Sequence, residues 1–343
     1  MPTGSPFHWP TARPVARLAA AVLAMLVAWV PLAAGSQDLV KPEGFPDRPL
    51  TIIVPYAEGG ESDLLSRAMA AALEKVMGAK VLVVNQPGEA GMAAVPQFMA
   101  APTDGYTLLE SIEEAPANYA AGKLPENPAV DWWPLGMAQV TFSQIYVRPG
   151  DVRFADWQSF AAYARTSPGD VKIANVANSG AMERANLFKL EQAVGFKINQ
   201  IGFDNPAERY AALIGGAVDA LFEQPGDVAS FLESGQMKPI LTLLGERPAG
   251  HEKVPTLNDI GAGFEPLLRY RGFWILPGVP EPRRRYLETA LHVAWLSEEF
   301  QAFNRQRAMH LIPSFRSHEE ATAMIEKSID AYREIFREMG PAQ

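Results

Sequence analysis

Short apolar strands alternate with amphipathic helices along most of this 343-residue chain. Residues 50–55 (LTIIVP) form an apolar run rich in β-branched residues, which predicts a buried strand. Apolar residues then recur at helical spacing from Leu64 to Met77, and Gly78 ends this predicted helix. Alternation of this kind implies right-handed strand–helix–strand units and a mostly parallel sheet.

The alternation continues through the chain, whose length predicts two domains. Further strands are expected at 80–84, 106–109, 140–147, 171–176, 198–201, 218–222, 239–244 and 271–276. Helices are expected at 91–100, 156–165, 183–194, 206–214 and 226–234, with more helices after 276. The last helix is the best marked, because Ser317 and Glu320 form a capping box and Gly340 ends it. Ligands of such sheets bind beyond the carboxyl ends of strands, so the informative loops are 56–63, 110–116, 177–184, 202–206 and 222–227.

The N-terminus has the layout of a secretory signal peptide. Arg13 and Arg17 supply the positive region, Leu18–Val30 is an apolar run of 13 residues, and small residues follow Pro31. The run is short for a membrane span, which needs about 20 residues; an uncleaved signal anchor is the alternative. We expect residues 1–36 to be removed and the mature protein to be periplasmic. With no Cys after the run, it would not be a lipoprotein.

Composition excludes several classes of protein. The chain has no Cys, so disulfides, thiolate metal sites and a Cys nucleophile are impossible. Its formal net charge is −9, and becomes −11 without Arg13 and Arg17. An acidic chain without a basic block is a poor candidate for nucleic acid binding. The five His show no helical pair, which favours surface positions over a metal site.

The loops lack the motifs of common enzymes. Ser62 follows Gly60-Glu61 but has no second Gly after it, so a hydrolase elbow is incomplete and a helix cap is the simpler reading. A phosphate loop needs Lys-Ser/Thr after its glycines, and acids stand there instead. We therefore expect neither catalysis nor a cofactor.

Two strand–loop–helix corners suit a carboxylate ligand. AEGGESD (57–63) precedes one helix and NSGAM (178–182) precedes another. A helix N-terminus offers unpaired N–H groups and a partial positive charge, and Arg184 could add a charge-assisted bond. Ordinary turns before helices favour the same residues, so this reading needs further support.

At these residues the chain resembles the substrate-binding proteins of tripartite tricarboxylate transporters, the Bug or TctC family. The resemblance covers about residues 44–340. It is carried by FPDRPLTIIVPYAEGGESDLLSRAMA (45–70), VVNQPGEAG (83–91), APTDGYTLL (101–109), LIGGAVDALF (213–222), VPTLNDIG (254–261) and RGFWILPGVPEP (271–282), in that order.

The resemblance implies an α/β, two-domain, periplasmic-binding-protein-like fold of type II. Each domain would be a mixed, mostly parallel sheet flanked by helices, with the ligand in the interdomain cleft. The expected domains are 44–145 plus 268–343, and 146–267. The candidate ligand-binding residues are Tyr56, Gly59, Gly60, Asp63, Ser111, Asn178, Ser179, Gly180, Arg184, Phe203, Asp204 and Glu223.

Acidic residues on the pocket-side loops depart from the family pattern. They are Glu58, Glu61, Glu113, Glu114, Glu183, Asp204, Glu223 and Asp227. We expect several to face solvent, because acids pointing inward would repel a dicarboxylate by about 1–4 kcal/mol per pair at 4 Å. The ligand is then expected to differ from a plain di- or tricarboxylate. It would carry a cationic group, or be aromatic or amide-like, with Phe203, Phe222, Tyr270 and Trp274 as stacking walls or, more simply, as core.

The sequence thus predicts a periplasmic protein, expected to be a monomer, that captures a small organic acid or related metabolite by cleft closure. It would deliver this ligand to membrane transporter subunits. The alternatives are an extracytoplasmic sensor that presents its closed form to a membrane partner, and an enzyme on the same scaffold.

Overall fold

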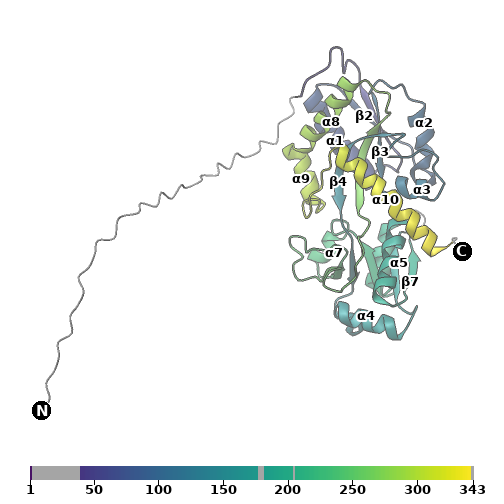
Figure 1. Cartoon of the computed structure of the whole chain (residues 1–343), viewed down its shortest axis with the longest axis vertical. Coiled ribbons are helices and arrows are strands. Elements are labelled where there is room, and N and C mark those ends of the chain that lie inside the picture. The colour runs from purple at the N-terminus through teal and green to yellow at the C-terminus, as the bar shows by residue number, and fades with distance from the viewer. Residues whose placement is uncertain (2–38, 177–180, 204, 341–343) are drawn as a thin grey trace. The chain divides into compact units, whose positions relative to one another are not determined.

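The computed structural model describes residues 1, 39–176, 181–203 and 205–340. Residues 38–343 form one compact unit, distinct from residues 1–37, which contain the predicted signal peptide. Within the described residues, ten strands form two five-stranded sheets, flanked by helices (Figure 1). The expected α/β two-domain fold is confirmed.

The first sheet has the strand order β2-β1-β3-β10-β4. Its strands are β1 (Leu50–Val54), β2 (Val81–Asn85), β3 (Thr107–Ile112), β4 (Trp133–Thr141) and β10 (Arg269–Ile275). One face packs against α1 (Glu61–Met77), α8 (Glu281–Trp295) and α9 (Glu298–Gln306). The other face packs against α2 (Val95–Met99) and α10 (His318–Met339), with the 3₁₀ turn η1 (Glu89–Ala94) and α3 (Glu114–Ala120) on the same side.

The second sheet has the order β7-β6-β8-β5-β9. Its strands are β5 (Gln144–Val147), β6 (Lys172–Asn175), β7 (Asn199–Gly202), β8 (Ala220–Glu223) and β9 (Lys238–Thr242). Its helices are α4 (Trp157–Thr166), α5 (Ala181–Val194), α6 (Pro206–Gly215) and α7 (Ala229–Glu233), with the turn η2 (Val152–Phe154). In each sheet a single strand, β10 or β5, runs against the other four, so both sheets are mixed and mostly parallel.

The strand predicted at 140–147 is wrong as a single element. The chain leaves the first sheet at Thr141 and enters the second sheet at Gln144, so Phe142 and Ser143 cross between the sheets. The sequence VTFSQIYV hides this break, because it is rich in strand-forming residues and has no Gly, Pro, Asn or Asp to mark a turn. The chain returns to the first sheet through β10, after residues 243–268.

The two sheets divide the chain near the predicted boundaries at 145/146 and 267/268. Strand β5 begins two residues before the first boundary, and β10 begins just after the second. The boundaries themselves stay a prediction.

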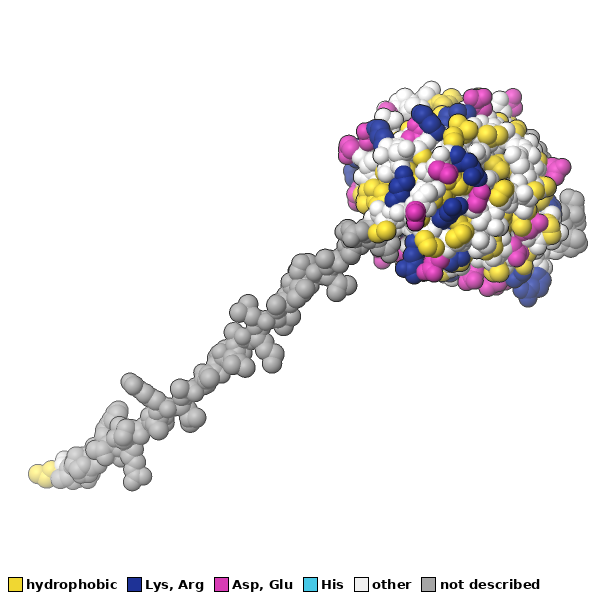
Figure 2. Space-filling view, turned by 90° about the horizontal axis from the view of Figure 1, so that it is seen from above, with side chains coloured by type: hydrophobic (Ala, Val, Ile, Leu, Met, Phe, Trp, Pro, Cys, Tyr) yellow, Lys and Arg dark blue, Asp and Glu magenta, His cyan; other side chains and the backbone are white. Residues whose placement is uncertain are grey.

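Helix α10 has the capping box that its sequence predicts. The Ser317 hydroxyl accepts a hydrogen bond from the N–H of Glu320, whose carboxylate accepts one from the N–H of Ser317. The helix packs on β4 and α3 of the first domain and on α5 of the second (Figure 1). On the face seen in Figure 2, acidic and basic side chains alternate with apolar ones and neither sign dominates. No described helix has the length and apolarity of a membrane span.

Candidate functional site

The loop between β1 and α1 is held by its own hydrogen bonds. The Gly59 N–H donates to the Asp63 carboxylate at 2.9 Å, and the Gly60 N–H donates to the Ala57 carbonyl at 3.2 Å. Gly59 has φ of 80°, which favours glycine. These two amides are therefore already paired, and the corner presents to a ligand only the N–H groups of the first turn of α1.

Asp63 acts within this loop. It is 1% exposed and forms an ion pair with Arg67 at 2.9 Å. Burial opposes ionisation, but hydrogen bonds from Arg67 and the Gly59 N–H bring the pKa of Asp63 below its usual value. Arg67 also donates to Glu58 and Asn85, each at 3.2 Å. These contacts give Asp63 a role in the structure of the loop, and its contact with a ligand stays a prediction.

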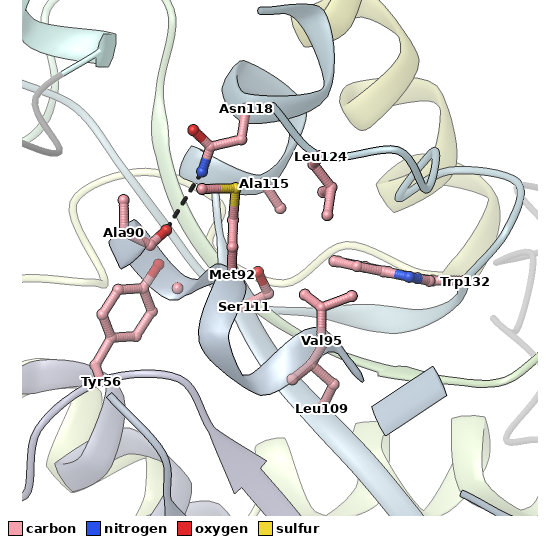
Figure 3. Close-up of a pocket in the computed structure, with 11 residues that line it drawn as sticks. Tyr56, Ala90, Met92, Val95, Leu109, Ser111, Ala115, Asn118, Leu124 and Trp132 are labelled. Carbon is pink, nitrogen blue, oxygen red and sulfur yellow. Dashed lines mark hydrogen bonds between the residues drawn. The ribbon is translucent and has the colours of Figure 1, made fainter. Parts of the chain in front are cut away.

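Tyr56 and Ser111 line one small pocket beyond the carboxyl ends of β1 and β3 (Figure 3). The other lining residues are Ala90, Gly91, Met92, Val95, Leu109, Ala115, Asn118, Leu124 and Trp132. The Asn118 amide donates to the Ala90 carbonyl at 3.3 Å across its mouth. The pocket has room for roughly one water molecule, so it is not itself a metabolite site.

Residues 88–91, two of which line this pocket, have unusual backbone geometry. Four successive residues, 88–91, have positive φ, and two of them, Glu89 and Ala90, are not glycine. Such conformations cost of order 1–3 kcal/mol each and occur at ligand clamps. The sequence NQPGEAG predicts a turn here, and the structure adds that the turn is strained.

The predicted second corner is largely outside the described residues. Asn178, Ser179 and Gly180 lie there, as does Asp204 in the third loop. Arg184, in the first turn of α5, is half-buried and close enough to Glu114 to lower its pKa. The roles of these residues stay predictions.

Glu223 and Phe203 meet at a buried arginine. Arg209 donates through Nη2 and Nε to one Glu223 oxygen, at 2.5 and 3.1 Å, and through Nη1 to the Phe203 carbonyl at 3.1 Å. The Tyr210 hydroxyl approaches the same Glu223 oxygen at 3.3 Å. Glu223 is 2% exposed, so its partners compensate its burial. Phe203 packs at the edge of the second domain's core.

The expectation that several loop acids face solvent is wrong for four of them. Glu113, Glu114, Glu183 and Glu223 are each at most 5% exposed, because both domains cover them. Glu58 is exposed, and Glu61 and Asp227 are half-buried. Three further ion pairs hold acids of these loops: Arg269 with Glu113, Arg269 with Glu183, and Arg307 with Glu61.

Arg269, the first residue of β10, connects the two domains. Its Nη1 lies 3.0 Å from Glu113 Oε1, between β3 and α3, and its Nη2 lies 2.5 Å from Glu183 Oε1, in the first turn of α5. The Glu113 carboxylate also accepts a hydrogen bond from the N–H of Tyr270 at 3.3 Å. A single guanidinium thus holds one carboxylate from each of the two domains.

Three acids near this contact have raised pKa values. Glu110 in β3 is fully buried, and burial, against the opposing effects of Ser62 and Arg271, raises its pKa to about 8. Burial and the nearby Glu223 carboxylate raise the pKa of Asp227 to about 7. Burial and the Glu113 and Glu183 carboxylates hold the pKa of Glu114 well above its usual value.

A third contact joins the chain after α9 to both domains. Arg307 Nε donates to the Glu61 carboxylate at 3.0 Å, in the first turn of α1. A Cβ added to Gly226, in the loop after β8, would lie 2.1 Å from the Arg307 carbonyl oxygen. Only glycine allows this approach of the two backbones.

The aromatic residues belong to the cores. Phe222, Tyr270 and Trp274 are at most 1% exposed and pack in hydrophobic clusters, so they are not stacking walls. His292 and His310 are exposed as expected, whereas His251 and His318 are half-buried. Across the described part of the chain, no group of His, Asp and Glu is arranged to hold a metal ion.

Sequence reasoning named Arg184 but missed three other cations of the site and one acid, Glu110. The missed cations are Arg209, Arg269 and Arg271. The side chains of Arg209 and Arg269 are 5% and 13% exposed, and Arg271 as a residue is 6% exposed. All three interact with the buried acids. A usable signal was present: Glu110 interrupts an apolar strand, and Arg269 and Arg271 alternate on another. A charge inside a strand that reads as buried indicates either a partner or a ligand.

Comparison with known proteins agrees with this architecture. Residues 65–340 match the model of the tripartite tricarboxylate transporter family receptor, TctC. The chain is 28% identical over 258 residues to a UPF0065 protein from Cupriavidus necator, covering 73% of each chain. It is 28% identical over 232 residues to protein BugT from Bordetella pertussis, covering 66% of this chain and 70% of that one.

Two solved structures have the same fold. A TctC solute-binding protein from Polaromonas, without ligand, superposes with a TM-score of 0.73 at 24% identity, over 86% of this chain and 99% of the other. MatC from Rhodopseudomonas palustris, solved with bound malate, gives a TM-score of 0.69 at 22% identity, over 85% and 99%. With its two sheets, its crossovers and a family match that spans most of its length, this chain belongs to the Bug/TctC family of tripartite tricarboxylate transporter receptors.

Proposed function

We propose that this protein captures a small organic ligand bearing a carboxylate in the cleft between its two domains. The observation that carries the proposal is Arg269, whose guanidinium contacts a carboxylate from each domain at the carboxyl ends of the strands. An arginine in this position is suited to a ligand carboxylate, which would exchange for one of the protein's own acids. Family membership as a receptor supports the same role.

Capture would proceed by domain closure without covalent chemistry. The crossover at Phe142 and Ser143 and the segment 243–268 are the connections about which the domains would move. A ligand shifts this equilibrium only by its differential affinity for the closed form. A micromolar dissociation constant corresponds to about −8 kcal/mol, which a few charge-assisted hydrogen bonds and burial in the cleft can supply.

The first test is native mass spectrometry of the protein purified from the periplasm. We expect a monomer that begins near residue 37 and retains a small ligand, which is recovered chemically unchanged. Small-angle scattering should then show a smaller radius of gyration with the ligand than without it. A ligand that is consumed would indicate an enzyme, and an unchanged radius would contradict closure.

Delivery to membrane transporter subunits is the second part of the proposal. It is supported by the family to which the chain belongs. Deletion of the gene should abolish uptake of the ligand identified by mass spectrometry, and a plasmid copy should restore it. Normal uptake with lost induction of ligand-responsive genes would instead favour a sensor.

A further inference from the structure

The two connections between the domains meet at His251. The outgoing connection is Phe142 and Ser143, and the returning connection, residues 243–268, contains His251. The imidazole ring of His251 packs edge-on against the Phe142 ring, with the ring centroids 6.1 Å apart and the planes at 85°. The Ser143 carbonyl accepts a hydrogen bond from the Leu243 N–H at 2.9 Å, so the two connections also touch through their backbones. His251 therefore lies at the hinge on which domain closure would depend.

A buried glutamine fixes the role of one His251 nitrogen. Gln144, the first residue of β5, is fully buried, and its Oε1 accepts a hydrogen bond from the Tyr146 hydroxyl at 2.8 Å. Its Nε2 donates to the Thr242 hydroxyl at 2.7 Å and lies 3.1 Å from His251 Nδ1. The opposite orientation of the amide would take from the buried Tyr146 hydroxyl the acceptor of its proton. Because an amide nitrogen only donates, His251 Nδ1 has to accept, and the proton of the neutral ring lies on Nε2.

Protonation of His251 is incompatible with this contact. The imidazolium ion carries an N–H on both ring nitrogens, so its Nδ1 would point a donor at the amide donor of Gln144. Two donors 3.1 Å apart cannot bond to each other, and both lose the hydrogen bond that they shared. A ring that turns away from Gln144 also leaves the edge-on contact with Phe142. A single proton therefore breaks the contacts of His251 with the outgoing connection and with β5.

The surroundings of the ring favour its neutral form. Burial lowers the pKa of His251 below its usual value, against the opposing effect of the neighbouring Glu252 carboxylate. The ring faces the uncharged side chains of Phe142 and Gln144. The Tyr146 hydroxyl beyond Gln144 is also uncharged, because burial holds its pKa well above the usual value. The contact is therefore complete at neutral pH and is lost as the pH falls below about 6.5.

We propose that His251 is a proton-sensitive latch on the hinge: its neutral ring holds the two connections together, and its protonation releases them and favours separation of the domains. The inference goes beyond ligand capture and rests on the domain closure of the proposed function. In the structure the domains touch where Arg269 binds Glu183 and where Gly226 meets Arg307. The latch belongs to this closed arrangement. A proton that binds more tightly once the latch is broken shifts the equilibrium towards the open one.

Spin labels, one on each domain, test the inference. The chain has no Cys, so Val130→Cys in the first domain and Val152→Cys in the second can be labelled selectively. These valines are 63% and 89% exposed. Pulsed electron paramagnetic resonance, on protein dialysed against ligand-free buffer, measures the distance between the labels. We expect the population with the longer distance to grow as the pH falls from about 8 to about 5. An unchanged population, or growth of the shorter distance, overturns the inference. No ligand takes part, so this outcome leaves the proposed function standing.

A variant identifies the group that titrates. In His251→Asn the amide oxygen takes the place of Nδ1, so it can accept the hydrogen bond from Gln144 and cannot be protonated in this range of pH. We expect the response of the distance to pH to be lost. His310→Asn is the matched control, because His310 is exposed, and it should keep the full response. A response in His251→Asn at least half as large as in the labelled parent overturns the inference, since another group, such as Asp227 with its pKa of about 7, would then be responsible.

Nuclear magnetic resonance of the unmodified chain gives a readout that needs no altered hinge. Nitrogen-15 chemical shifts of the imidazole distinguish its two tautomers, and the His251 signals are those that His251→Asn lacks. We expect an unprotonated Nδ1 at a pH of about 8, and a titration midpoint below 6.5 that coincides with the change in distance. A proton on Nδ1 of the neutral ring, or a midpoint above 6.5, overturns the inference.

Discussion

Gly91, in the turn η1, packs closely against Tyr56, which follows β1. Its φ is 90°, and an added Cβ would lie 2.8 Å from the Tyr56 hydroxyl oxygen. Gly91→Ala should therefore lower the free energy of unfolding by about 1–3 kcal/mol, measured by urea denaturation. Gly235→Ala is the control, because Gly235 also has positive φ (67°) but no atom within 4 Å of the added Cβ. Equal losses in the two variants would show that Tyr56 is not the cause.

The Arg209–Glu223 pair tests how much the buried charges depend on one another. Its side chains are 5% and 3% exposed. Arg209→Met leaves a buried carboxylate alone and should cost about 3–5 kcal/mol of unfolding free energy. The double variant Arg209→Met/Glu223→Leu should lose less than the single one. As a surface control, Arg305→Met, whose partner Glu298 is 80% exposed, should cost at most about 1 kcal/mol. A double variant less stable than Arg209→Met would contradict this account.

At the scale of elements, periodic and capped segments were predictable and crossovers were not. Helix α10 follows directly from its capping box and apolar stripe, since both are local features. The break between β4 and β5 depends on which sheet each half joins, and that is decided by distant partners. The same limit applies to the site: the first loop was found from local glycines, but the contact of Arg269 with Glu183 joins residues 86 positions apart.

Strand β3 has an ionisable residue in its buried interior, which makes stability depend on pH. The pKa of Glu110 is about 8 in the folded protein and about 4.5 when the side chain is solvated, so the folded state binds the proton more tightly. The stabilisation that follows from this raised pKa is complete below about pH 4.5 and is lost as the pH rises towards 8. Unfolding free energy should fall between pH 6.5 and 8.5, on the order of 1–2 kcal/mol for Glu110, and Glu110→Gln should reduce this slope to the part that Asp227, with a pKa of about 7, contributes. Acids with lowered pKa, such as Asp63, titrate well below this window and do not interfere. An equal slope in the variant would contradict the assignment to Glu110.

At the scale of the whole molecule, the structure shows where several of the acidic residues lie. The net charge of −9 makes the chain a poor candidate for nucleic acid binding, and the acids on the loops lead us to expect a ligand other than a plain di- or tricarboxylate. The structure buries several of these acids where the two domains meet, and Arg269 pairs there with one acid from each domain. Glu113, Glu183 and Glu223 are buried there, so their charges are balanced by arginines and not by solvent. Sequence alone could not distinguish acids on a solvated surface from acids buried between the domains, because the loops are equally polar in both cases.

Closure can be tested at a site remote from these charges. Gly226 follows β8 of the second domain, and Arg307 follows α9, which packs against α1 of the first. In Gly226→Ala the new Cβ would meet the Arg307 carbonyl oxygen at 2.1 Å and the carbonyl carbon at 2.7 Å, and neither backbone atom can rotate away. The variant should fold but hold its domains apart, with a larger radius of gyration in small-angle scattering. Ligand affinity should fall by at least tenfold, because a ligand gains its contacts to both domains only in the closed form. Gly263→Ala, where the added Cβ has no atom within 4 Å, should change neither quantity. A Gly226→Ala protein with unchanged radius and affinity would show that this contact takes no part in closure.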